Sequence, residues 1–348
     1  GLRDWPHHRM AVVGSSLGGF YASWVAHHCR CPSVVLNPAV DPARDLARYI
    51  GEQSHWHRPE DRFEFRAAYI AELQALDLRG QAPAGPELAI IAKGDELLDW
   101  REMAARYAQA QTISFTDERI KASYVNYPSP GGNSGTMRGY LVQPTKPGPF
   151  PAVLVVHENR GLNPYIEDVA RRLAAEGFLA LAPDGLFPVG GYPGNDDDGR
   201  TLQAKLDQAK LRVDMENSAR FVKSHTQSTG KLGVTGFCYG GGITNYLAAK
   251  LGADMQAGVP YYGVAADTAS VANIKAPLVC HLAENDERIN ATYPAFETAL
   301  KAAGVDYQIH TYPGTQHGFH NNSTPRYNEV AAKASWERTL AHFRKHLA

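Results

Sequence analysis

The sequence predicts an α/β fold, in which a mostly parallel sheet is covered by helices on both faces. From about residue 120 onward, short apolar runs alternate with amphipathic stretches, which is the pattern of strands joined by helices. The runs are almost continuously apolar, as expected for parallel strands that are buried on both faces. The length of 348 residues leaves room for about two domains.

The elements of this larger part follow from the same alternation. A turn-rich stretch at 128–135 is expected to join two antiparallel strands that lead into the parallel sheet. Strands are then expected at 152–156, 178–182, 232–236, 257–262, 278–282 and 307–312. Helices are expected near 165–176, 199–224, 241–250, 291–303 and 326–346.

The first 110 residues show the same alternation on a smaller scale. Strands are expected at 10–13, 33–36 and 87–92, with helix-like segments between them. Three strands are few for a sheet of this kind. We therefore divide the chain into an incomplete α/β segment at 1–112 and a complete domain at 113–348.

The composition argues against several classes of protein. The formal net charge of −1 provides no field that would attract nucleic acid or an anionic membrane surface. The seven apolar residues at 150–156 are far too few to cross a bilayer, and four cysteines are too few for a disulfide scaffold. The chain begins at Gly1 without an export leader, so the sequence leaves the compartment open between cytoplasm and periplasm.

The sharpest local motif is Gly236-Phe237-Cys238-Tyr239-Gly240, between an expected strand and an expected helix. It has the G-x-S-x-G pattern of a nucleophile elbow, with a cysteine in place of the serine. The tight turn needs glycine on both sides, because a Cβ would clash with the neighbouring turn, and the helix N-terminus favours a thiolate. The competing interpretation is a buried structural cysteine flanked by glycines.

An acid and a histidine follow in the order that this type of site requires. Asp286 comes after the strand expected at 278–282, and His317 comes after the strand expected at 307–312. Glu284 and Glu287 are near enough in sequence to compete with Asp286 for the role of the acid. Cys238, Asp286 and His317 are therefore the predicted catalytic triad, in an α/β-hydrolase fold.

With these motifs in place, residues 113–348 resemble the dienelactone hydrolase family, the carboxymethylenebutenolidases. The resemblance covers two thirds of the chain. It rests on Val156-His157-Glu158-Asn159-Arg160-Gly161, on Pro183-Asp184, on the Cys238 elbow, on Glu284-Asn285-Asp286, and on Gly314-Thr315-Gln316-His317-Gly318-Phe319.

The resemblance implies a role for each matching residue. Cys238 matches the nucleophile, His317 the base and Asp286 its orienting acid. Glu158 matches a glutamate that interacts with the thiol in the resting enzyme and moves when substrate arrives. The resemblance places the oxyanion hole at the backbone N–H groups of Tyr239 and Asn159. The alternative for Glu158 is a salt bridge with Arg160.

The sequence departs from the shorter family members where they hold the substrate carboxylate. Those proteins carry a basic residue just after the histidine loop, whereas this chain continues Phe319-His320-Asn321-Asn322 and has no arginine before Arg326. A basic residue of the helix around 205–212 could supply a contact instead, although those residues also suit a solvated helix face. The departure argues against dienelactone itself as the substrate.

The first segment resembles a small bacterial esterase family of the α/β-hydrolase fold, with Ser16 at the nucleophile and Asp95 at the acid. No early strand precedes Met10, and no histidine occurs between Asp95 and His157. A serine without a base is a poor nucleophile near neutral pH. Both residues are therefore predicted to be vestigial. We expect the segment to cover surface, pack on the second domain or make a homodimer contact.

The leading hypothesis is an enzyme that hydrolyses a small-molecule ester or lactone through a Cys238 acyl-enzyme. The sequence implies no cofactor and no metal, since its histidines and carboxylates lack metal-ligand spacing. One alternative is a general short-chain carboxylesterase. Another is a non-catalytic binding protein on the same fold, because fold does not determine function.

Overall fold

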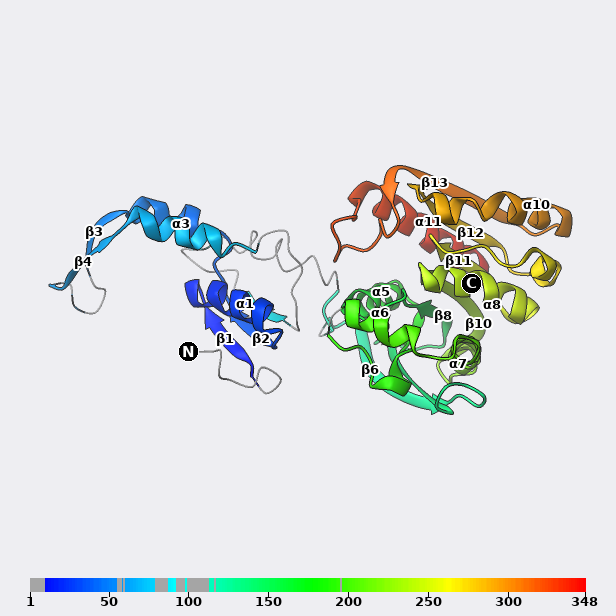
Figure 1. Ribbon diagram of the computed structural model, residues 1–348. Coiled ribbons are helices and arrows are strands. Elements are labelled where there is room, and N and C mark those ends of the chain that lie inside the picture. Colours follow the sequence, from blue (N-terminus) through cyan, green and yellow to red (C-terminus); the bar gives the residue numbers. More distant parts are fainter. Residues whose placement is uncertain are drawn as a thin grey trace. The chain divides into compact units, whose positions relative to one another are not determined.

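The computed structural model describes residues 10–54, 58, 60–78, 87–91, 98, 113–115, 117–194 and 196–348. The chain folds as two compact units, Gly1–Gln109 and Ala110–Ala348 (Figure 1). No helix among the described residues is both long enough and apolar enough to span a membrane.

The C-terminal unit is built on one eight-stranded sheet with the order β13-β12-β11-β10-β8-β9-β7-β6. The strands β6 and β7 are antiparallel and joined by the predicted turn, and β7 is also antiparallel to β9, while the other neighbours are parallel. The strands are β6 (Ile120–Pro128), β7 (Thr136–Pro144), β8 (Phe150–Val156), β9 (Leu179–Pro183), β10 (Ser228–Phe237), β11 (Ala257–Tyr261), β12 (Leu278–Asn285) and β13 (Tyr307–Gln316).

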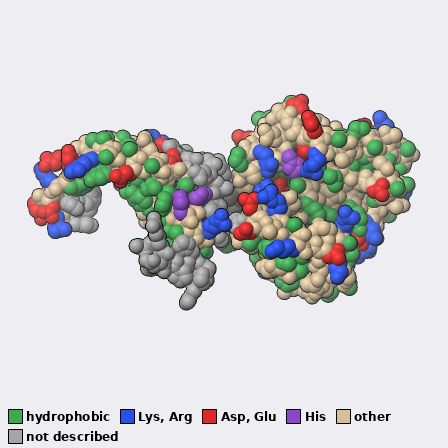
Figure 2. All heavy atoms as spheres, viewed as in Figure 1, with side chains coloured by type: hydrophobic (Ala, Val, Ile, Leu, Met, Phe, Trp, Pro, Cys, Tyr) green, Lys and Arg blue, Asp and Glu red, His purple; other side chains and the backbone are tan. Residues whose placement is uncertain are grey.

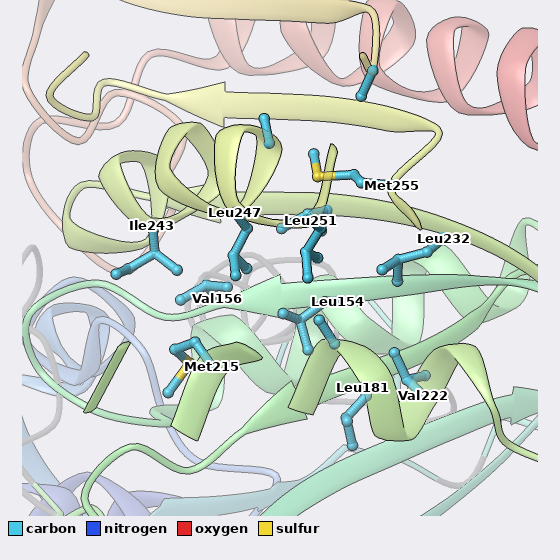
Figure 3. Close-up of a cluster of buried hydrophobic side chains, with 14 of the residues drawn as sticks. Leu154, Val156, Leu181, Met215, Val222, Leu232, Ile243, Leu247, Leu251 and Met255 are labelled. Atoms are coloured by element: carbon cyan, nitrogen blue, oxygen red, sulfur yellow. The ribbon is translucent and has the colours of Figure 1, made fainter. Parts of the chain in front are cut away.

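Helices cover both faces of this sheet, so its strands are buried on both sides. Successive residues of β8 show this directly, because Leu154 and Val156 belong to one core cluster and Val153 and Val155 to the other. The first cluster includes residues of α7, α8 and α10, and Figure 3 shows the β8 side chains between α7 and α8. The second includes residues of α5 and α11. The helices are α5 (Pro164–Ala175), α6 (Asp196–Ala204), α7 (Gln208–Lys223), α8 (Tyr239–Leu251), α9 (Glu287–Asn290), α10 (Tyr293–Ala303) and α11 (Glu329–Leu347).

One helix that the sequence predicts is divided into two helices in the structure. The sequence predicts a single helix at 199–224, but the structure has two helices there, α6 and α7, with a short non-helical segment between them. Asp207 is the N-cap of α7, and its carboxylate accepts the backbone N–H groups of Ala209 at 2.9 Å and Lys210 at 3.1 Å. A capping aspartate supplies the partners that the first turn of a new helix lacks, so it favours a restart at this point.

The N-terminal unit contains a three-stranded parallel sheet with the order β1-β2-β5 and a separate β3-β4 hairpin, which the sequence did not predict. Helix α1 packs on β1 and β2. Val13, Leu88 and Ile90 remain exposed on this sheet. The elements are β1 (Val12–Ser15), α1 (Leu17–Cys29), β2 (Ser33–Leu36), α2 (Pro42–Leu46), β3 (Gly51–Ser54), β4 (Arg62–Phe65), α3 (Ala67–Ala75) and β5 (Glu87–Ile90).

Candidate active site

Cys238 lies at the sharp turn between β10 and α8, where it is the N-cap residue of the helix. Its backbone has φ 54° and ψ −109°, a conformation that L-residues rarely adopt and that functional sites retain. The flanking glycines permit the turn. A Cβ at Gly236 would lie 2.2 Å from the Gly240 carbonyl oxygen, and a Cβ at Gly240 would lie 2.2 Å from the Val156 carbonyl oxygen.

The sulfur of Cys238 lies against the backbone N–H groups of Tyr239 and Asn159, the two donors predicted for the oxyanion hole. Burial and, to a lesser extent, the nearby Glu158 carboxylate raise the pKa of the thiol to about 11, although the two N–H groups and Arg288 oppose the shift. The thiol is therefore neutral at neutral pH. The helix N-terminus alone does not make Cys238 a thiolate.

His317 and Asp286 are brought together from the ends of two neighbouring strands, β13 and β12. Nδ1 of His317 lies 2.5 Å from Oδ2 of Asp286, and the Asp286 side chain is buried. Burial lowers the pKa of His317, while Asp286 acts in the opposite direction. The competing acid Glu284 instead accepts the backbone N–H of Gly314 at 2.8 Å. Of these carboxylates, Asp286 is the one placed to orient the imidazole.

Glu158 is buried two residues after the end of β8, beside the thiol. Its Oε2 atom accepts a hydrogen bond from Nδ2 of Asn321 at 2.8 Å. Burial raises the pKa of Glu158, and Arg160 and the Asn321 amide lower it in part. The hydrogen bond to Asn321 was not expected from the sequence. Asn321 does lie in the stretch after the histidine loop where the shorter family members carry a basic residue and this chain has none.

Arg160 does not form the salt bridge with Glu158 that was the alternative interpretation. Its guanidinium instead pairs with Asp196 of α6 at 2.6 Å. Asp196 also accepts hydrogen bonds from Tyr192 at 2.9 Å and from Asn163 at 3.2 Å. Arg160 thus acts on Glu158 only through its electrostatic field.

A cavity of about 700 Å³ opens beside Cys238 and Tyr239. Two arginines line it, Arg212 of α7 and Arg288 of α9, and among the described residues neither is in an ion pair with a carboxylate. Arg212 packs over the ring of Tyr246, at 5.4 Å. The expected helix thus brings one arginine to the cavity. Arg288 was not predicted as a cavity residue, although its position two residues after Asp286 indicates that it lies near the triad. The rest of the lining is formed by Asn159, Gly242, Ile243, Val264, Ala265, Ala266, Asp267, Ser270 and Ile289.

Charged side chains of both signs are interspersed with apolar ones on the face of the C-terminal unit that Figure 2 shows.

Among the described residues, no three His, Cys, Asp or Glu side chains come together in a group that could hold a metal ion.

Ser16 of the N-terminal unit occupies an elbow of the same shape, with φ 51° and ψ −122° at the N-cap of α1. Its N–H donates to the Leu36 carbonyl at 3.0 Å, as the Cys238 N–H donates to the Tyr261 carbonyl at 3.0 Å. Gly18 differs from its counterpart Gly240, because a Cβ at Gly18 would meet no described atom within 4 Å. The predicted acid Asp95 lies outside the described residues.

Comparisons with known proteins find relatives of both parts of the chain. The dienelactone hydrolase family matches residues 137–347, and an uncharacterised protein family (UPF0227) matches residues 4–123. A Yersinia pestis protein provisionally named a carboxymethylenebutenolidase is 30% identical over 259 residues, covering 70% of this chain and 96% of its own. A hydrolase fragment of Escherichia coli strain K12, provisionally named as such, is 66% identical over 102 residues, 29% of this chain and 86% of its own.

Solved structures show the same relationship. The crystal structure of a Klebsiella pneumoniae protein, provisionally described as a dienelactone hydrolase, superposes with a TM-score of 0.56 at 29% identity, covering 64% of this chain and all of that one. A metagenomic dienelactone hydrolase-like phosphotriesterase superposes with a TM-score of 0.57 at 23% identity, covering 66% of this chain and all of that one, and so shows the fold alone. By its family match, its relatives and its fold, this chain belongs to the dienelactone hydrolase family of hydrolases.

Proposed function

We propose that this protein hydrolyses a carboxylic ester or lactone through a thioester on Cys238. The observation that carries the proposal is the position of the sulfur, which lies in a nucleophile elbow, against two backbone N–H donors, at the wall of a cavity. His317 supplies a base that Asp286 orients. A buried structural cysteine would need neither the donors nor the cavity.

The reaction follows from these groups. The thiol turns toward His317 and gives up its proton, and the thiolate attacks the substrate carbonyl carbon. The carbonyl oxygen becomes an oxyanion, which the N–H groups of Tyr239 and Asn159 stabilise. The carbon–oxygen bond then breaks, and the leaving alkoxide takes the proton from His317. Water, deprotonated by His317, attacks the thioester and releases the acid and the thiol.

Arg212 and Arg288 favour a substrate that carries a negative charge. Both line the cavity beside Cys238, and neither is neutralised by an ion pair among the described residues. An anionic group on the substrate would supply the missing partner, and the apolar part of the lining, such as Ile243 and Val264, would contact the rest of the molecule. The proposed anion contact is therefore made by residues of α7 and α9 and not by the loop after His317.

A substrate panel tests the proposal. Turnover is measured with a carboxylate-bearing enol-lactone, with its neutral methyl ester and with p-nitrophenyl acetate, each beside the Cys238→Ala variant. We expect the carboxylate-bearing lactone to give the highest kcat/KM and Cys238→Ala to abolish its turnover. A higher value for p-nitrophenyl acetate would indicate a general short-chain carboxylesterase. Failure to turn over all three would favour a binding protein.

A further inference from the structure

The loop after His317 carries a side chain that is fixed in one orientation toward Glu158. Asn321 donates from Nδ2 to Oε2 of Glu158 at 2.8 Å, and both side chains are buried. Its Oδ1 accepts the backbone N–H of Ser323 at 2.9 Å and the Ser323 hydroxyl at 2.6 Å. Because Ser323 occupies the amide oxygen, the NH₂ group is the end of the amide that faces the carboxylate.

The same short loop positions the base. Asn321 follows His317 by four residues, and its backbone N–H donates to the Gly318 carbonyl at 3.0 Å. The Asn321 carbonyl in turn accepts the backbone N–H of Thr324 at 3.2 Å. These backbone bonds make the loop a compact series of turns. A movement of the loop that shifts His317 would therefore also shift the hydrogen-bond donor of Glu158.

We propose that Asn321 is a positioning residue that holds the Glu158 carboxylate beside Cys238 in the resting enzyme and so couples the histidine loop to the reactivity of the thiol. The proposal rests on the proposed function, because it assigns Asn321 a part in the control of that nucleophile. Asn321 acts through Glu158.

The group that holds Glu158 is the neutral side-chain amide of Asn321, so the negative charge of Glu158 stays beside the thiol. The one basic group in the loop of Glu158, Arg160, is held by Asp196 at 2.6 Å. An amide orients the carboxylate without cancelling its charge, whereas a guanidinium in direct contact would cancel it. The charged and titratable groups that face Glu158 are Arg160, Asp196, Cys238, Tyr165, Tyr262 and Arg326.

The test measures alkylation of Cys238 by iodoacetamide against pH, which needs no substrate. Asn321→Leu keeps the side-chain volume and removes the donor. Without its donor the buried Glu158 carboxylate takes up a proton or leaves its place, so we expect the thiol pKa to fall. Alkylation at pH 7.5 should then quicken by about tenfold for each unit that the thiol pKa falls. The matched control is Asn322→Leu, at the neighbouring position, which should alkylate at the wild-type rate.

A double-mutant cycle separates this role from a general loosening of the loop. In the Glu158→Gln background, Asn321→Leu should cause no further change in the thiol pKa. An equal increase in both backgrounds, or an unchanged rate in Asn321→Leu alone, would overturn the proposal.

A milder variant covers the case in which Asn321→Leu does not fold. Ser323→Ala keeps Asn321 and removes one of the two bonds to its Oδ1. It should shift the thiol pKa in the same direction by a smaller amount, and no shift would count against the proposal. Failure of the proposed function would look different, because either none of the three substrates would be turned over or Cys238→Ala would retain turnover, whatever the alkylation data show.

Discussion

The α-carbon of Gly240 lies so close to Val156 that a methyl group on it would sit 2.2 Å from the Val156 carbonyl oxygen. This contact joins the start of α8 to the end of β8, next to the segment that carries Glu158 and Asn159. The matching residue of the N-terminal elbow, Gly18, has no such neighbour among the described residues. The two glycines stand at the same place in the motif but differ in what surrounds them.

Alanine at these two positions should therefore have opposite effects. Gly240→Ala is expected to lower the free energy of unfolding by about 1–3 kcal/mol, because backbone must shift to admit the methyl group. In Gly18→Ala the methyl group meets no described atom within 4 Å and lies in a helix, so the change should be neutral or stabilising by about 0.5–1 kcal/mol. Thermal unfolding by scanning calorimetry measures both. An equal loss in the two variants would refute this difference in surroundings.

Asp286→Asn should lower kcat by about 10²–10⁴ with little change in KM, because the neutral amide no longer stabilises the imidazolium or its tautomer. Steady-state kinetics on the preferred ester or lactone measures this. Glu287→Gln is the control, since Glu287 is exposed on α9 and was one of the two other candidate acids. A loss in Glu287→Gln as large as that in Asp286→Asn would contradict the assignment.

Alkylation of wild-type Cys238 by iodoacetamide should be slow at pH 7 and should rise about tenfold per pH unit, levelling off near pH 11. The sign follows from the raised pKa of about 11, since only the thiolate reacts and its fraction grows until the pH passes that value.

Glu158→Gln should move this profile to lower pH, because it removes the negative charge that opposes the thiolate. Turnover should fall in the same variant, since the link between substrate binding and thiol activation is lost. Rates are measured from pH 6 to pH 11 with both proteins. A superimposable profile would show that Glu158 does not gate the thiol.

Ser16→Ala should leave kcat/KM unchanged within about twofold. The elbow geometry alone does not ionise a hydroxyl, which needs an adjacent base. A drop of tenfold, worth about 1.4 kcal/mol of transition-state stabilisation, would mean that a histidine from elsewhere completes that site. Cys238→Ala, assayed beside it, provides the inactive reference.

The order of strands and helices in the C-terminal unit could be predicted because each signal is local. The strand expected at 152–156 lies within β8, and the turn expected at 128–135 joins β6 to β7. Apolar runs and glycine-rich turns act over a few residues, so periodicity reports them. The break between α6 and α7 escaped this approach, because a single cap at Asp207 outweighed a helical pattern on both sides.

The sequence by itself determined the elbow at Cys238 and the order in which Asp286 and His317 follow it. These features depend on motif spacing and on the ends of apolar runs, which are local properties of the sequence. Only the tertiary structure decided which side chain holds Glu158 and where Arg160 points. Asn321 is 163 residues from Glu158, and Asp196 is 36 residues from Arg160. Such partners are chosen by the packing of separate loops at the edge of the sheet, where distance along the chain does not indicate distance in space.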